Sequence, residues 1–210
     1  MPPPVITVLV IESRPVMLLG IKAAFADAVD VRLIAESSSA SEGLEKFKTL
    51  SPDVTIIALR FPDTCTIDDL GRHFDHRPKA RIIVLADHAG DAEIGRALKH
   101  GAAGYITNDV SAEDLLDAVR TVSSGRNFIS QPIAQVLSNS CGQEELTADE
   151  MNVLRLIVGE MSNKEIAFAL DVSENTVKTH IKDLFGKLAV SDRTSAATLA
   201  IKRGLVRADL

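Results

Sequence analysis

The chain of 210 residues has few of the features that mark secreted, membrane-bound or strongly basic proteins. Its two cysteines, Cys65 and Cys141, are spaced neither as a disulfide framework nor as a zinc motif. No apolar run approaches the roughly 18 to 20 residues of a membrane span. The first residues lack the basic start and the long apolar run of a signal peptide. These absences predict a protein of the reducing cytoplasm with no membrane segment.

Charge and motifs exclude further classes. The net charge of −6 argues against non-specific coating of nucleic acid, so any such contact must come from a local basic surface. No Ser-His-Asp setting and no phosphate-binding glycine loop occurs at diagnostic spacing. His73 and His76 lie near Cys65, but this spacing does not complete a metal-ligand set. We therefore predict no enzyme, no metal and no cofactor.

Residues 1–125 alternate short apolar runs with helical patterns. The runs are rich in β-branched residues and bounded by Pro, Asp or Gly, as in buried parallel strands, and lie at 6–11, 31–34, 54–59, 82–86 and 104–106. Helices are expected between and after them, at about 15–26, 40–49, 66–76, 91–100 and 111–124. This alternation predicts an α/β domain with a doubly wound, five-stranded parallel sheet.

The pattern changes after Gly125. The hydrophobic period weakens there and Ser138–Gln143 is polar, so we expect a linker over 126–144. Residues 145–210 are helical in pattern throughout, which predicts a second, all-α domain.

Capping signals divide that second domain into four helices. Thr147 and Ser162 are each followed three residues later by a glutamate, which is typical of a capping box at a helix start. Residues 171–173 form a short turn with Ser173 as the N-cap of a third helix, and a fourth is expected near 192–203.

The third of these helices has two different faces. An inward stripe is predicted from four apolar residues at helical spacing, Val177, Ile181, Leu184 and Leu188. The outward face then carries Lys178, Thr179 and Lys182. Two short helices, a tight turn and a basic outer face predict a helix-turn-helix.

These residues resemble a known family. The match to the four-helix LuxR-type DNA-binding domain lies in Leu146–Thr147, Ser162–Ile166, Thr176–His180, Asp192–Thr194 and Gly204–Val206. With the α/β domain before it, the chain resembles a response regulator of the NarL/FixJ type. The resemblance implies a receiver-like domain, double-stranded DNA as partner, and transcription regulation as function.

The resemblance also implies roles on the helix-turn-helix. Lysine can donate to guanine O6 or N7, and a threonine methyl can contact that of thymine, so Lys178, Thr179 and Lys182 are the implied base readers. Residues at or near helix starts suit phosphate contacts, namely Thr176, Asn163, Lys164, Arg193 and Thr194. Gly186 lies inside the helix while Ala189 replaces the family's following glycine, so we expect a displaced or frayed helix end.

Receivers of this family accept a phosphoryl group on an aspartate after the third strand. Acidic residues after the first strand hold Mg²⁺, and a hydroxyl and a lysine follow the fourth and fifth strands. The matching positions here are Glu12, Ser13, Ala58, Ala86 and Asn108. Only Glu12 has a carboxylate, and an alanine methyl cannot form an acyl phosphate. We therefore predict a degenerate site and regulation without aspartyl phosphorylation.

Three further residues lie near these positions. Asp63 and Asp87 are in loops after strands and are interpreted as solvated turn residues. Tyr105 matches the aromatic switch residue of receivers and is interpreted as a packing or interface residue.

The role of such a receiver stays open between three hypotheses. The first is a dimerisation module that holds two helix-turn-helix domains on a two-fold operator. The second is a crevice, lined by the five matching residues, that binds a small molecule or a partner protein and thereby releases the DNA-binding domain. The third is a signalling adaptor with a vestigial DNA-binding domain.

Overall fold

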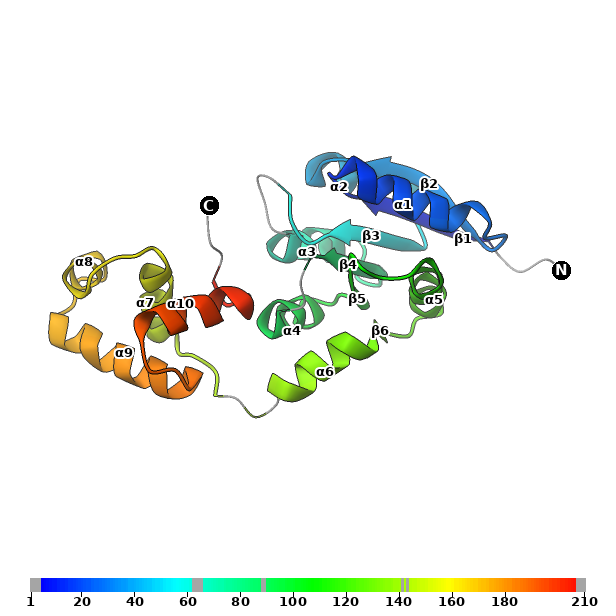
Figure 1. Ribbon diagram of the computed structural model, residues 1–210. Helices are drawn as coiled ribbons and strands as arrows, with labels where there is room; N and C mark the ends of the chain where they lie inside the picture. Colours follow the sequence, from blue (N-terminus) through cyan, green and yellow to red (C-terminus); the bar gives the residue numbers. More distant parts are fainter. Residues whose placement is uncertain (1–4, 62–65, 88–89, 141, 143, 207–210) are drawn as a thin grey trace. The chain divides into compact units, whose positions relative to one another are not determined.

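The computed structural model describes residues 5–61, 66–87, 90–140, 142 and 144–206 (Figure 1). Its contacts divide the chain into two compact units, residues 1–89 with 94–137 and residues 90–93 with 138–210. Among the described helices, none has both the length and the apolar character that crossing a bilayer requires.

A parallel sheet forms the centre of the first unit, in the order β2-β1-β3-β4-β5-β6. Its strands are β1 (Ile6–Ile11), β2 (Val31–Ser37), β3 (Val54–Ala58), β4 (Ile82–Ala86), β5 (Gly104–Thr107) and β6 (Phe128–Ile129). The first five confirm the predicted strands, and the sheet has one strand more than predicted.

Helices cover both faces of this sheet (Figure 1). Buried side chains of α1 (Pro15–Ala26) and α5 (Ala112–Ser123) share one apolar cluster with alternate strand residues such as Val8 and Val10. The other strand residues, such as Leu9 and Ile11, pack with the helices of the second layer, α2 (Ala40–Leu50), α3 (Thr66–His76), α4 (Asp91–Lys99) and α6 (Gln131–Ser140). The predicted doubly wound α/β fold is therefore confirmed.

The segment expected to be a linker, 126–144, contains β6 and α6. Ile133 of α6 is fully buried, and Val136 and Leu137 pack against the same cluster. Their spacing is helical, but the stripe covers little more than one turn among polar residues, so it gave too short a period to predict a helix.

Over residues 144–206, which the structure describes, the second unit contains α7 (Ala148–Val158), α8 (Asn163–Ala169), α9 (Glu174–Leu188) and α10 (Arg193–Lys202). Both predicted capping boxes are present, at Thr147 with Glu150 and at Ser162 with Glu165. Ser173 accepts a hydrogen bond from the Thr176 N–H, as predicted for the N-cap of α9. The four helices enclose one apolar core, which includes Val153, Leu154, Ile157, Ile166, Val177, Leu184, Ala196 and Ala200.

The end of α9 differs from the expectation of a displaced or frayed end. Ala189 adopts the left-handed conformation, with φ 53° and ψ 43°, directly after Leu188. Its N–H donates to the Gly186 carbonyl, and the Val190 N–H donates to the Phe185 carbonyl. The helix is therefore closed at this point by an alanine in a conformation that usually favours glycine.

Candidate functional sites at the strand ends and on helix α9

The carboxyl ends of four strands meet at one edge of the sheet. In the parallel register Ile11 pairs with Ile57, so Glu12 and Ala58 follow side by side. On the other side of β3, Ala58 pairs with Leu85, and Ala86 at the end of β4 pairs with Thr107. Asn108 directly follows β5. The sheet thus brings four of the five predicted positions to one place, which we call the strand-end site: Glu12, Ala58, Ala86 and Asn108.

Two of these positions offer only methyl groups. Ala58 and Ala86 are each 1% exposed and belong to the same buried apolar cluster as Tyr105, whose side chain is fully buried. Tyr105 is thus a packing residue. The Ala58 carbonyl is also engaged, because it accepts a hydrogen bond from the Thr66 hydroxyl.

Glu12 is bound by a neighbour that sequence analysis did not name. Its side chain is buried and accepts hydrogen bonds from Nε and Nη2 of Arg14, at 2.9 Å to Oε1 and 2.7 Å to Oε2. The backbone N–H of Arg14 also donates to Oε1, at 2.8 Å. This two-pronged arrangement is the strong form of an arginine–carboxylate pair. Ser13, between them, is half-buried.

The same guanidinium reaches two further strand ends. Nη2 donates to Oδ1 of Asn108 at 3.2 Å, and Nη1 contacts the Asp87 carboxylate, to which the Asn108 amide also donates. Asp87 is exposed in a bend after β4, as expected of a solvated turn residue, but it is also part of this network. Asp63 lies outside the described residues.

The charge of Arg14 is stabilised by this position. Its hydrogen bond to Glu12 raises the pKa of Arg14 above its ordinary value, against the smaller opposing effect of burial, and Asp87 adds to the rise. The strand-end site thus contains a permanent cation among two carboxylates and an amide.

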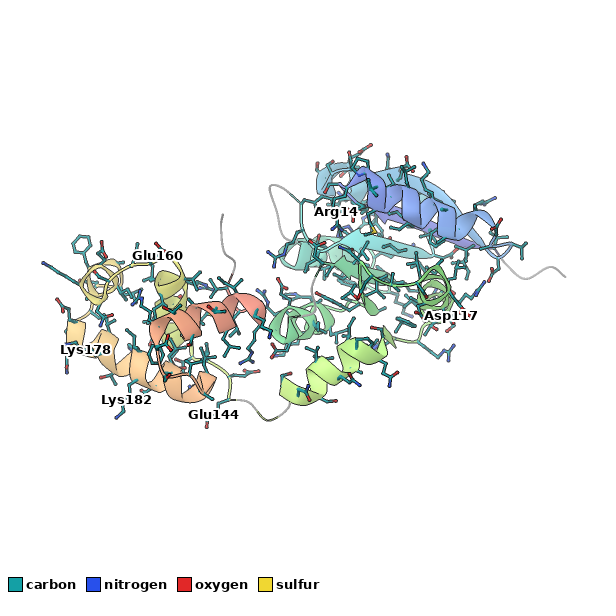
Figure 2. The ribbon with its side chains drawn as sticks, viewed as in Figure 1. Arg14, Asp117, Glu144, Glu160, Lys178 and Lys182 are labelled. Carbon is teal, nitrogen blue, oxygen red and sulfur yellow. The ribbon has the colours of Figure 1, made fainter. Side chains whose placement is uncertain are left out.

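On the second unit, the predicted base readers lie on one face of α9. Lys178, Thr179 and Lys182 are exposed, and both lysines project away from the helix (Figure 2). Val177 and Leu184 are buried on the opposite side.

The Thr179 side chain has a hydroxyl that is hydrogen-bonded within α9 and a methyl group that is not. Its hydroxyl donates to the Asn175 carbonyl at 3.1 Å, which leaves the methyl as its principal contact group. Asn175 itself is exposed on the same side of α9, one turn before Thr179, and was not among the predicted residues.

The five predicted phosphate-contacting residues differ in what they offer. Lys164 and Thr194 are exposed, and Asn163 is half-buried at the start of α8. The other two are engaged within the unit. The Thr176 hydroxyl is 2.8 Å from that of Ser173, and the Arg193 guanidinium donates to the Met161 carbonyl.

Both parts of the chain match known families. Residues 8–120 match the response regulator receiver domain, and residues 144–200 match the bacterial regulatory proteins of the luxR family. The transcriptional regulatory protein MctR of Rhizobium johnstonii is 32% identical over 206 residues, which cover 97% of this chain and 96% of MctR. The nitrate/nitrite response regulator protein NarL of Escherichia coli is 30% identical over 200 residues, covering 91% and 93%.

Solved structures of RcsB have the same fold. RcsB from Salmonella enterica serovar Typhimurium, bound to promoter P1flhDC in the presence of the phosphomimetic BeF3−, gives a TM-score of 0.74 at 23% identity, over 92% of this chain and 97% of that chain. A structure of two RcsB dimers bound to two parallel DNAs also gives 0.74, at 22% identity over 94% and 98%. The chain therefore belongs to the response regulators of the NarL/FixJ family, and it is a DNA-binding transcriptional regulator, not an enzyme, with a receiver domain and a LuxR-type DNA-binding domain.

Proposed function

We propose that this regulator binds a specific operator as a homodimer in the cytoplasm and that it does so without phosphorylation of an aspartate. Residues 1–125 are its receiver-like domain, 126–144 a connecting segment whose helix α6 packs on that domain, and 145–210 its DNA-binding domain. The observation that carries the proposal is the strand-end site, where Ala58 stands at the acceptor position and Arg14 binds Glu12.

Three chemical requirements of phosphoryl transfer are unmet at this site. A methyl group at position 58 cannot attack phosphorus. Mg²⁺ needs oxygen ligands, and both oxygens of Glu12 already accept hydrogen bonds from Arg14. Ala86 and Asn108 supply neither the hydroxyl nor the ammonium that would stabilise a phosphoryl group.

Sequence recognition is assigned to Lys178, Thr179 and Lys182 of α9. Their exposure supports this role, since a lysine reaching guanine and a methyl reaching thymine both need a side chain free to enter the major groove. Asn163, Lys164, Thr176, Arg193 and Thr194 are proposed to contact phosphates. Thr176 and Arg193 are the weaker candidates, because both also form hydrogen bonds within the unit.

Dimerisation is proposed because a two-fold operator presents two half-sites, and each chain has one α9. The RcsB structure with two dimers on DNA supports this part of the proposal. The contacts of Arg14 disfavour the alternative in which a ligand binds in the crevice. A polar ligand there would have to break the contacts of Arg14 with Glu12, Asp87 and Asn108.

The test is selection of random DNA duplexes with the unmodified full-length protein, followed by titration at several salt concentrations. The logarithm of the affinity should fall with the logarithm of salt by about 0.9 per phosphate contact. Lys178→Ala should relax the preference at one base pair by about tenfold. Lys202→Ala is the matched control, since it removes the same charge from exposed α10 and should leave base preference unchanged.

Two results would count against the proposal. The first is an operator affinity that rises on treatment with acetyl phosphate and Mg²⁺. The second is unchanged regulation in the cell by the double variant Lys178→Ala, Lys182→Ala, which would favour the adaptor hypothesis.

A further inference from the structure

One side chain joins three strand ends of the receiver. Arg14 follows β1, Asp87 follows β4 and Asn108 follows β5, and the guanidinium contacts both of the others while it also holds Glu12. The Asn108 amide closes the group by donating to Asp87. Glu12 and Asp87 thus share one counter-charge, although they are far apart in the sequence.

We propose that Arg14 is the resident cation of the strand-end site and takes the place that a divalent metal ion would hold in a phosphorylated receiver. Arg14 is a positioning residue in this proposal. It fixes the loops after β1, β4 and β5 relative to one another, so the receiver keeps one arrangement whether or not Mg²⁺ is present. The structural part of this inference, that Arg14 fixes the loops, does not depend on the proposed function. Its consequence for regulation rests on that proposed function.

Burial explains why a cation is needed there. The Glu12 side chain has no exposed surface, and a carboxylate in such a position is costly unless it is paired and hydrogen-bonded. The Asp87 side chain is half exposed, but it shares the Arg14 guanidinium with Glu12. Removing Arg14 would therefore leave the buried Glu12 carboxylate without its cation, while the Asp87 carboxylate stays nearby.

The shape of arginine explains why this residue suits the position. A planar guanidinium presents its donors in fixed, diverging directions, so it can hold Glu12 with two of them and still reach Asp87 and Asn108. A lysine ammonium is a compact charge on a flexible chain and lacks this fork.

The test is thermal unfolding of the full-length protein, with and without MgCl2, against NaCl of matched ionic strength. The wild type should melt at the same temperature in both salts. Arg14→Ala should melt about 4 °C or more below the wild type in NaCl, and MgCl2 should restore part of this loss by neutralising the two carboxylates. Arg14→Lys should melt between the two and gain less from MgCl2.

The control is Lys48→Ala, which removes an exposed ion pair with Glu45 on α2 and should change melting by less than Arg14→Ala. The proposal fails if Arg14→Ala melts like this control, or if MgCl2 stabilises the wild type as much as the variant. It also fails if Arg14→Ala is destabilised but gains nothing from MgCl2, since Arg14 would then be an ordinary ion pair. If Arg14→Ala does not fold, Arg14→Lys decides the question by the same comparison. Because no DNA is present, these outcomes are independent of operator binding.

Discussion

At the scale of single residues, α9 has a glycine in its interior, where alanine would be more stable, and it is followed by an alanine in the left-handed conformation, which favours glycine. Gly186 lies within the helix, and a Cβ built on it would meet nothing within 4 Å. Ala189 has a φ of 53°, a left-handed conformation that an L-residue with a side chain adopts at a cost. Both residues therefore lower the stability of the helix without a steric reason inside the unit.

Gly186→Ala and Ala189→Gly should each raise the free energy of unfolding by about 1 kcal/mol, measured by urea denaturation. Gly43→Ala on α2 is the opposite case, because its Cβ would lie 2.6 Å from side-chain atoms of Ile11. That variant should be destabilised. A loss of stability in Gly186→Ala would mean that the glycine has a structural role that its open surroundings do not explain.

The residue scale also shows why Arg14 escaped sequence analysis. The loss that we propose, of the acceptor, of one acidic residue, of the hydroxyl and of the lysine, was predicted position by position from Ala58, Ser13, Ala86 and Asn108. The network around Arg14 joins residues 73 and 94 positions apart, and such contacts leave no local pattern in one sequence. The one available signal was an arginine two residues after an acidic residue at a strand end.

At the scale of elements, the sequence was sufficient to predict a helix or strand whose ends are marked by residues close to it in the chain. Thr147, Ser162 and Ser173 predicted three helix starts because a cap bonds to the chain three residues later. β6 and α6 were missed because a two-residue strand and an apolar stripe of little more than one turn give too short a pattern in the sequence. β6 pairs with β5 over two residues, and α6 is held mainly by the burial of Ile133.

Ile133→Ala should therefore destabilise the receiver by about 2 to 5 kcal/mol, because it removes a fully buried side chain and leaves a cavity. Calorimetry or urea denaturation of the full-length protein would measure it. Ile129→Ala in β6 is the matched control, since Ile129 is 37% exposed and should cost much less. Equal losses in the two variants would show that α6 contributes no more to the receiver than an exposed edge residue.

A buried ion pair joins α7 and α9 of the second unit. Lys187 of α9 donates to Glu150 of α7 at 2.8 Å, and Glu150 is 5% exposed. Burial would raise the pKa of Glu150, but the hydrogen bonds from Lys187 and from the Thr147 N–H outweigh it, so the pKa lies below its ordinary value of 4.5.

The lowered pKa of Glu150 makes the free energy of unfolding of the second unit depend on pH. The unfolded chain takes up a proton on Glu150 at a higher pH than the folded chain, so the stabilisation is complete above the ordinary pKa and is lost as pH falls through the folded pKa. Lys187→Ala should cost about 1 to 3 kcal/mol near pH 7 and should flatten the loss of stability below about pH 4.5. Urea denaturation between neutral and acid pH measures both. An acid-induced loss as steep in Lys187→Ala as in the wild type would contradict this account.

At the scale of the whole molecule, the proposed function implies that the receiver differs from a phosphorylated one at several positions at once. Restoring the acceptor alone should therefore fail. In Ala58→Asp the new carboxylate would be placed beside Glu12, whose oxygens are bound by Arg14, and it would still lack a hydroxyl at 86 and an ammonium at 108. After incubation with acetyl phosphate and MgCl2, the intact mass of Ala58→Asp should be unchanged.

A combined variant tests whether the fold itself is competent. With Ser13→Asp, Arg14→Ala, Ala86→Thr and Asn108→Lys added to Ala58→Asp, the Mg²⁺ ligands and the donors to phosphoryl oxygens are all supplied. This variant should gain the mass of one phosphoryl group. If Ala58→Asp alone gained it, the Arg14 network would be no barrier to metal binding, and the proposed loss of phosphorylation would rest on a single residue. If neither variant gained it, the arrangement of the loops after β1, β4 and β5 would be set by more than the side chains of the strand-end site.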